Sequence, residues 1–232
     1  MNKLKILKSI FILILLIGLI TNGAVQTSAA TDPIKATSVY YKGIQDLSYI
    51  QLDGIKDKKI KDNINYYLRQ VERSHFLAYT ELMKAMKEDY DEKYCAEYPS
   101  SCQYTYTTKF KIDYQDSNYV SIIVTSDTFT GGAHGNRLLE SYNFNIKTGK
   151  RILLTDIVKP AKAQQTKQYI FNYLKNNKII FDDMTVKNIK LNKDSVFTFS
   201  KTGIKVYYQS YEVAAYAYGN PEVNVPKSIY KY

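Results

Sequence analysis

The stretch TFTGGAHGNR at residues 128–137 contains one of the chain's two histidines and three of its ten glycines. His134 could act as a general base if a carboxylate oriented it, and Asp127 and Asp156 are candidates for that carboxylate. The glycines instead suit a tight turn between two strands, because glycine adopts positive φ without steric cost. The spacing fits neither a phosphate loop nor a dinucleotide-binding fingerprint. We therefore interpret the stretch first as a structural turn, with a ligand-contacting loop and a catalytic histidine as alternatives.

The rest of the chain offers no recognisable catalytic or metal-binding pattern. A G-x-S-x-G nucleophile elbow is absent from the sequence. The other histidine, His75, lies on the apolar stripe of a predicted helix, which indicates a satisfied core or boundary residue. A zinc site would need three or four ligands, often two of them histidines. The acidic segment 88–94 lacks the spacing and the glycine of a calcium loop.

We accordingly expect no metal and no cofactor. A pair of glycosidase-type carboxylates stays open, because acidic residues occur throughout the chain and nothing in the sequence singles out two of them.

The two cysteines, Cys95 and Cys102, flank a Pro-Ser-Ser turn in the sequence CAEYPSSC. In an oxidising compartment, two cysteines at this separation indicate one small disulfide loop. No histidine lies nearby in the sequence, so we do not expect a metal site there. The pairing would also leave no thiolate that could act together with a histidine. We predict that the disulfide holds a connection between a helix and a strand.

The first thirty residues have the pattern of a secretory signal peptide. Three lysines precede an apolar run at residues 10–20, and the small residues at 28–30 fit a cleavage site. The run is shorter than the roughly 20 residues of a spanning helix, and a retained anchor is the alternative interpretation. The mature chain would be exported to a periplasm, a cell envelope or the outside, with no further membrane span.

The net charge is +10, and it becomes 10 − 3 = +7 when the three lysines of the signal peptide are removed. The charge is spread along the chain without a run of Lys or Arg, which argues against a nucleic-acid-binding arm. A basic exported protein can attract anionic envelope polymers or an acidic partner. A genome whose codons favour lysine would explain the same charge.

Two stretches have helical periodicity. The first is expected from about residue 57 into the acidic segment 88–94, with apolar residues recurring every three or four positions. The second is expected over residues 161–176, with Ile170, Phe171, Tyr173 and Leu174 on its apolar face.

The remaining runs are short, rich in β-branched and aromatic residues, and separated by turn sequences, so they predict mostly antiparallel sheets. The pattern is typical of an α+β protein. We divide the chain into a signal peptide at residues 1–30 and two small lobes at 31–114 and 115–232, each packed by one main helix.

Three motifs occur in a fixed order: TGGAHG at residues 130–135, TGK at 148–150, and YEVAAYAYG at 211–219. Together they resemble a bacterial extracytoplasmic family that consists of two adjoining domains of unknown function, DUF4163 followed by DUF3298. The resemblance covers essentially the whole mature chain. It implies an α+β fold of two lobes that lies outside the cytoplasmic membrane.

The same resemblance implies a function in the cell envelope. In some members, which are lysozyme-sensing anti-sigma factors, this region binds lysozyme; in certain peptidoglycan deacetylases it precedes a catalytic domain. Because this chain resembles the extracytoplasmic module alone, we expect a non-catalytic module that binds peptidoglycan-type glycan or a lysozyme-like hydrolase. The alternatives are an envelope glycan hydrolase or deacetylase that uses His134 with a nearby acid, and a structural or assembly protein of the envelope.

The composition adds one indication about binding. The chain has 23 tyrosines and no tryptophan, and tyrosine offers a flat apolar ring with a hydroxyl that suits sugars and protein surfaces, although it is also a common strand residue. The candidate binding residues are Thr130, Gly131, Gly132, His134, Asn136, Tyr211, Tyr216 and Tyr218. The sequence leaves the identity of the ligand and the oligomeric state open.

Overall fold

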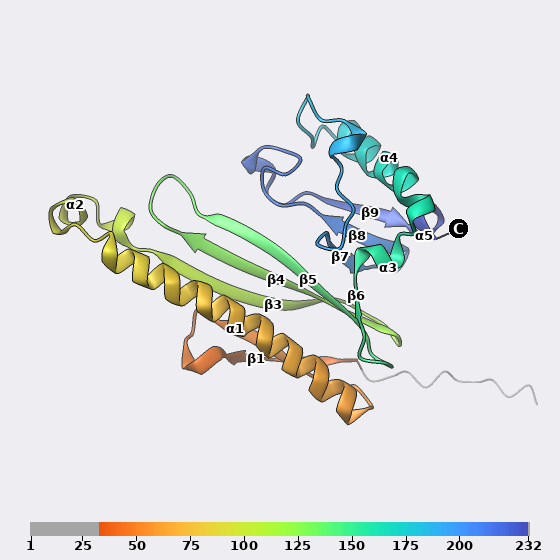
Figure 1. Cartoon of the computed structure of the whole chain (residues 1–232), viewed down its shortest axis with the longest axis horizontal. Helices are drawn as coiled ribbons and strands as arrows, with labels where there is room; N and C mark the ends of the chain where they lie inside the picture. The colour runs from red at the N-terminus through yellow and green to blue at the C-terminus, as the bar shows by residue number, and fades with distance from the viewer. Residues whose placement is uncertain (1–32, 232) are drawn as a thin grey trace, which may run out of the picture. The chain divides into compact units, whose positions relative to one another are not determined.

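The computed structural model describes residues 33–231 (Figure 1), so the predicted signal peptide at residues 1–30 lies outside the described residues. These described residues belong to one compact unit. The strands are β1 (Lys35–Tyr40), β2 (Ser48–Asp53), β3 (Thr105–Gln115), β4 (Tyr119–Phe129), β5 (Asn136–Asn145), β6 (Arg151–Ile152), β7 (Val196–Phe199), β8 (Gly203–Tyr207) and β9 (Glu222–Pro226). The helices are α1 (Lys58–Glu88), α2 (Glu92–Glu97), α3 (Leu154–Ile157), α4 (Pro160–Asn176) and α5 (Lys227–Tyr230). Within the described residues, no helix is long and apolar enough to cross a membrane.

The predicted α+β class is confirmed, and every strand pair in the sheets is antiparallel. β1 and β2 form a hairpin, β3 to β6 form a four-stranded sheet in sequence order, and β7 to β9 form a three-stranded sheet. Two main hydrophobic cores follow from this arrangement. One lies between α1, the β1–β2 hairpin and the four-stranded sheet, and the other lies between α4 and the three-stranded sheet (Figure 1).

Helix α1 has the periodicity that the sequence predicted. Asp57 caps its first turn, with the carboxylate accepting a hydrogen bond from the Ile60 N–H at 3.0 Å. Ile64, Leu68 and Val71 recur at helical spacing and are buried against the four-stranded sheet. The opposite face of the helix is exposed to solvent, which is why the pattern of the sequence was readable.

Helix α4 begins at Pro160, whose fixed φ suits a first helical turn. Ile170 and Leu174 are fully buried in the second core, as predicted. Tyr173, which we expected on the same apolar face, is 37% exposed. The expectation for Tyr173 was wrong because a position next to Leu174 is rotated about 100° away from the buried stripe.

The two cores are joined through the edge strand β7, which lies across one face of the four-stranded sheet. The Phe197 N–H donates to the Ser141 hydroxyl at 2.9 Å, and the Phe199 N–H donates to the Ser121 hydroxyl at 3.0 Å. The Asn143 side-chain amide donates to the Phe197 carbonyl at 2.8 Å. Polar side chains of β4 and β5, buried at Ser121 and Asn143, therefore satisfy backbone groups of β7 that would otherwise lack partners.

Asp113 adds a second connection between the cores. A β-bulge between Ile112 and Tyr114 shifts the register of β3 against β4. The Asp113 carboxylate accepts hydrogen bonds from the Thr198 hydroxyl at 2.8 Å and from the Tyr207 hydroxyl at 2.9 Å. A residue of the bulged strand thus contacts β7 and β8 directly.

The predicted division between residues 114 and 115 falls at the end of β3, inside the four-stranded sheet. That sheet combines strands from both predicted lobes, and residues 33–231 belong to one compact unit. The division into two lobes at this position stays a prediction.

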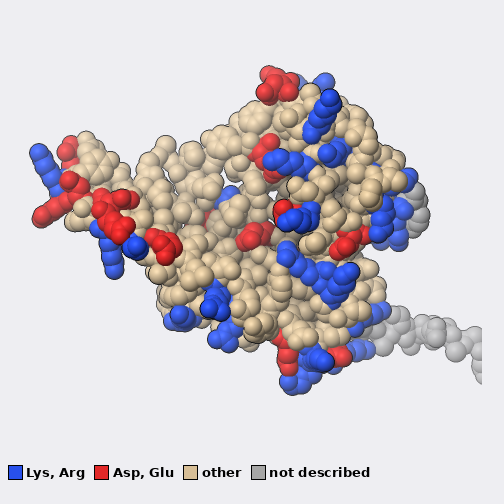
Figure 2. All heavy atoms as spheres, viewed as in Figure 1, with Lys and Arg blue, Asp and Glu red and all other residues tan. Residues whose placement is uncertain are grey.

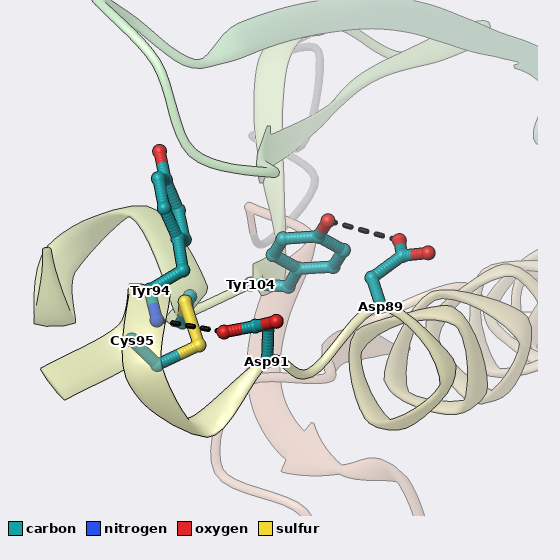
Figure 3. The surroundings of a disulfide bond; sticks show 6 residues. Asp89, Asp91, Tyr94, Cys95 and Tyr104 are labelled. Carbon is teal, nitrogen blue, oxygen red and sulfur yellow. Dashed lines mark hydrogen bonds between the residues drawn. A yellow bond between two sulfur atoms is a disulfide. The ribbon is translucent and has the colours of Figure 1, made fainter.

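Cys95 and Cys102 form the predicted disulfide, with their Cα atoms 5.7 Å apart (Figure 3). The bond closes the short connection from α2 to β3, which is the helix-to-strand position that the sequence indicated. Asp91 caps α2 by accepting a hydrogen bond from the Tyr94 N–H at 2.7 Å. The Tyr104 hydroxyl donates to Asp89 at 3.0 Å and so ties the start of β3 to the end of α1.

Candidate functional site

The TGGAHG motif forms the loop that joins β4 to β5. Gly131 and Gly132 have φ values of +84° and +92°, a region that side chains of L-residues disfavour. A Cβ atom on Gly131 would lie 2.5 Å from the Ser101 carbonyl oxygen, and one on Gly135 would lie 2.8 Å from the Thr128 carbonyl oxygen. The loop therefore packs against its own hairpin and against the disulfide-bonded segment, and this part of the motif is a glycine-dependent turn.

His134 projects from this turn and is exposed. One ring nitrogen, Nδ1, lies 2.8 Å from the Gly135 carbonyl oxygen, which fits an Nδ1–H donor. The imidazole stacks on the Tyr216 ring, with the ring centres 4.0 Å apart and the planes 21° from parallel. The Tyr216 hydroxyl donates to the same Gly135 carbonyl at 3.0 Å. Two of the three motifs that carried the family resemblance, TGGAHG and YEVAAYAYG, therefore meet in space.

Tyr211 continues this aromatic surface. Its ring centre lies 5.6 Å from that of Tyr216, and the side chain is 57% exposed. Its backbone has φ of +64°, which is unusual for a residue other than glycine. Such an outlier is found where surrounding structure holds a residue in place, often at functional sites. Tyr218 is also exposed but makes no ring contact with another aromatic side chain among the described residues.

A groove of about 690 Å³, which we call the hairpin groove, lies beside this aromatic surface. The ends of β4 and β5 form one side, with Asp127, Asn136 and Arg137, and the segment 207–220 forms the other, with Tyr216. Arg137 makes two hydrogen bonds to the Asp127 carboxylate, at 2.6 and 3.2 Å, and their contact raises the pKa of Arg137.

The predicted binding residues divide into three groups in the structure. Asn136 and Tyr216 line the hairpin groove, and Tyr211 lines a hollow next to it. His134 stacks on the Tyr216 ring. The others do not line these hollows: Thr130, Gly131, Gly132 and Tyr218 lie in the turn or on the exposed surface nearby.

Neither acid that could have oriented His134 contacts it. Asp127 pairs with Arg137, and Asp156 accepts a hydrogen bond from the Leu153 N–H at 3.0 Å at the start of α3. Among the described residues, no cluster of His, Cys, Asp and Glu could hold a metal ion. The geometry at His134 supplies stacking and hydrogen-bonding surfaces, without a carboxylate to orient the imidazole as a base.

A second group of polar side chains lies under α1 and was not recognisable in the sequence. His75 is buried, as predicted, with Nδ1 lying 2.7 Å from the Tyr106 hydroxyl and Nε2 lying 2.9 Å from Glu140. The Tyr142 hydroxyl also donates to Glu140, at 2.9 Å. Burial raises the pKa of Glu140, but the hydrogen bond and charge of His75 outweigh it and lower that pKa overall. Because these residues come from α1, β3 and β5, no local pattern connects them.

Two family models match consecutive parts of the chain. Residues 34–137 match the family described as "Deacetylase PdaC", and residues 147–228 match "Protein of unknown function (DUF3298)". The two matches follow one another along the chain, with the PdaC match first and the DUF3298 match second. The predicted resemblance to the DUF3298 family, and to a region of peptidoglycan deacetylases, is confirmed.

A protein of known function is also similar to this chain in sequence. A peptidoglycan-N-acetylmuramic acid deacetylase, PdaC of Bacillus subtilis, is 25% identical over 232 aligned positions, which cover 93% of this chain and 47% of the relative. This chain thus spans about half the length of that protein.

Crystal structures of DUF3298 family proteins from Bacteroides fragilis and Pseudomonas aeruginosa share the fold. Their TM-scores are 0.58 and 0.55 and their identities 16% and 19%. The alignments cover 84% and 85% of this chain, and 89% and 93% of the two solved chains.

The family matches assign the two sides of the hairpin groove to different regions. His134 and Asn136 lie near the end of the segment that matches the PdaC model, and Tyr211 and Tyr216 lie in the segment that matches the DUF3298 model. The groove is therefore complete only when both regions are present and packed together.

Proposed function

We propose that the chain is an exported, non-catalytic module that binds peptidoglycan-type glycan in the hairpin groove. The observation that carries the proposal is the stacked pair of His134 and Tyr216, extended by Tyr211, beside a groove with polar side chains. The match to a region of a peptidoglycan deacetylase supports peptidoglycan as the class of ligand. The signal-peptide pattern at residues 1–30 supports export to a periplasm, a cell envelope or the outside.

The chemistry of the groove suits a sugar. An aromatic ring with one exposed face can cover the apolar face of a pyranose, and a hydroxyl or amide beside it can bond to the sugar hydroxyls. Asn136 and Asn220 offer both donors and acceptors, and the guanidinium of Arg137 offers donors only. Such a mixture of a few polar groups with flat apolar surface is typical of ligand pockets.

The groove continues along the surface, which favours a polymer over a small molecule. A second hollow of about 460 Å³ shares Tyr207 and Ser210 with the hairpin groove. A third, of about 300 Å³, shares Asp194, Ser195 and Val196 with the second. A linear glycan with attached peptides could occupy several of these hollows at once.

Long-range charge does not single out the groove. On the face shown in Figure 2, Lys and Arg side chains are spread widely, whereas acidic side chains gather at the α2 end. The sequence places Glu88, Asp89, Asp91, Glu92 and Glu97 there. We therefore expect specific retention to depend on ring stacking and hydrogen bonding, and to persist at about 0.15 M salt, where the screening length is roughly 8 Å.

The test is retention of the purified mature chain on insoluble peptidoglycan at that salt concentration. Replacing Tyr216 with Ala removes the ring on which His134 stacks, and we expect retention to fall at least ~10-fold. Tyr216→Phe keeps the ring and loses only the hydrogen bond to Gly135, so it should retain most of the binding. Tyr66→Ala, at a position 67% exposed on α1, is the remote control and should bind like the parent.

Three outcomes would contradict the proposal. The parent chain could fail to bind peptidoglycan, or Tyr216→Ala could bind as well as the parent. The third is release of deacetylated or cleaved glycan by the parent and loss of that activity in His134→Ala, which would establish the enzyme alternative. The same experiment with a soluble lysozyme-like hydrolase in place of peptidoglycan tests the second expected partner. Binding to the hydrolase without retention on peptidoglycan would exclude the glycan as the ligand.

A further inference from the structure

On the outer edge of β5, which faces away from β4, the backbone N–H and carbonyl of one residue, Ser141, are left for a ligand. The directions of these groups follow from Leu139, two residues earlier. The Leu139 N–H donates to the side-chain oxygen of Gln209 at 3.0 Å, and the Gln209 amide donates to the Leu139 carbonyl at 2.7 Å. Both backbone groups of Leu139 therefore point away from β4. Because these directions alternate along an antiparallel strand, the N–H and carbonyl of Ser141 and Asn143 also point outward.

Both ends of this edge are closed. Gln209 occupies the position beside Leu139, and β6 pairs with β5 through Ile152 opposite Asn143. After Ile152 the chain turns away into α3, which starts at Leu154. Within residues 33–231, no hydrogen bond from another segment reaches the Ser141 N–H or carbonyl on this edge. The open stretch is thus one residue long, and a strand that ran past it would collide with Gln209 or β6.

Ser141 lines the third hollow of about 300 Å³, which we call the edge pocket. Ile152, Val196 and Phe197 supply apolar surface there, and Arg151 supplies a guanidinium. A mixed pocket of this size, mostly polar with some apolar surface, suits a small residue, and a cation that lines the same pocket as an unbonded N–H suits an anionic group.

The two carboxylates that line the edge pocket are paired with other residues, so Arg151 keeps N–H donors for an anion. Glu140 is paired with His75 at 2.9 Å, and Asp194 is paired with Lys193 at 3.1 Å. Arg151 makes no ion pair with a carboxylate among the described residues, although its charge helps to lower the pKa of Glu140. It donates to the Tyr67 hydroxyl at 2.5 Å and lies 4.8 Å from the centre of the Tyr142 ring. Rings on which a guanidinium rests hold it in place and leave other N–H donors for a bidentate contact with a carboxylate.

We propose that the edge pocket binds the carboxyl-terminal residue of a short peptide. The N–H of that residue would donate to the Ser141 carbonyl, and its carboxylate would accept from the Ser141 N–H and from Arg151. A chain end fits because the open edge is a single residue long. The inference rests on the proposed function for its ligand source, the peptide arms of peptidoglycan, and gives them a site separate from the sugar-binding groove.

The test is an NMR titration of the ¹⁵N-labelled mature chain with acetyl-D-alanyl-D-alanine. We expect the Ser141 amide signal to shift with a Kd on the order of 1 mM, as for a ligand of few atoms. The C-terminal amide of the same peptide lacks the carboxylate, and a version with a methylated final peptide nitrogen lacks the donor. Each should bind at least ~10-fold more weakly.

Protein variants give the second readout. Arg151→Gln should weaken the peptide at least ~10-fold, whereas Lys109→Gln, at an exposed position on the opposite edge strand β3, should not change it. The melting temperature of each variant shows whether it is folded. If Arg151→Gln does not fold, the modified peptides still test the same contacts in the parent chain.

The outcomes separate this inference from the proposed function. Peptide binding that survives in Tyr216→Ala, with glycan retention lost, is the expected result. Equal binding of the carboxylate and amide peptides, or no shift at Ser141, would overturn the peptide site while leaving glycan retention by the parent intact. Peptide binding without any glycan retention would refute the sugar-binding groove and leave the contact at Ser141 standing.

Discussion

At the scale of single residues, Glu72 carries the clearest physical consequence. It is fully buried on α1, and its Oε1 accepts a hydrogen bond from the Thr108 hydroxyl at 3.1 Å, while Oε2 has no partner within residues 33–231. Burial raises its pKa from the ordinary 4.5 to about 7, although the charge of His75 and the bond from Thr108 oppose the rise. The folded state therefore holds a proton that the unfolded chain releases at lower pH.

This shift makes stability depend on pH in a definite direction. The contribution of Glu72 is fully present below about pH 4.5 and is lost as the pH rises through about 7. Glu72→Gln mimics the protonated form, so we expect the variant to exceed the parent in free energy of unfolding at pH 8 by about 1–3 kcal/mol. Urea unfolding from pH 5 to 8 measures it.

The matched control is Glu81→Gln, at an exposed position of the same helix, which should follow the parent at every pH. If Glu72→Gln loses as much stability between pH 5 and pH 8 as the parent does, the buried charge of Glu72 is not the cause of the loss.

At the scale of elements, the loop between β4 and β5 depends on close contact as well as on backbone conformation. Gly131 and Gly132 both have positive φ, but only Gly131 faces another backbone, that of Ser101. A Cβ atom added to Gly132 would meet no other atom of the described residues within 4 Å. Substitutions at these two neighbouring glycines can therefore separate the cost of a positive φ from the cost of a steric clash.

Alanine at each position tests this separation. Gly132→Ala should cost about 1 kcal/mol for the positive φ alone. Gly131→Ala should cost roughly 2–4 kcal/mol, because its Cβ must also displace the Ser101 carbonyl beside the disulfide. Thermal and urea unfolding of the two variants provide the comparison, and equal losses would show that the loop moves away from Ser101 at little cost.

Elements with one buried face were predictable, and contacts between distant elements were not. The stripe of Ile64, Leu68 and Val71 predicted α1, because helical periodicity is a local property of the sequence. The stacking of His134 on Tyr216 joins two motifs far apart in the chain, so the sequence could nominate both residues but could not place them together. The contact between His75 and Glu140 had no local signal at all.

At the scale of the whole molecule, the two cores are held together by buried polar contacts. Asp113 reaches from the bulge of β3 to the hydroxyls of Thr198 and Tyr207. Burial, the largest cause, and the nearby charge of Asp113 raise the pKa of Tyr207. The sequence could not reveal this connection, because the bulge depends on how β3 and β4 pair.

Removal of this connection should destabilise both cores together. Asp113→Ala leaves two hydroxyls without their acceptor, and we expect a loss of about 1–3 kcal/mol in the free energy of unfolding. Asp183→Ala, in an exposed loop, is the control and should stay within about 0.5 kcal/mol of the parent. A variant as stable as the parent would mean that other groups replace the carboxylate as acceptor.

The side chains that cover β7 also affect how copies of the protein meet one another. A bare strand edge is a template on which a neighbouring chain can add a strand and begin to aggregate. Ser121, Ser141 and Asn143 occupy the backbone groups of that edge from within the same molecule. Because the Phe197 N–H, the Phe197 carbonyl and the Phe199 N–H are already bonded, they are not available to pair with a strand of a second copy.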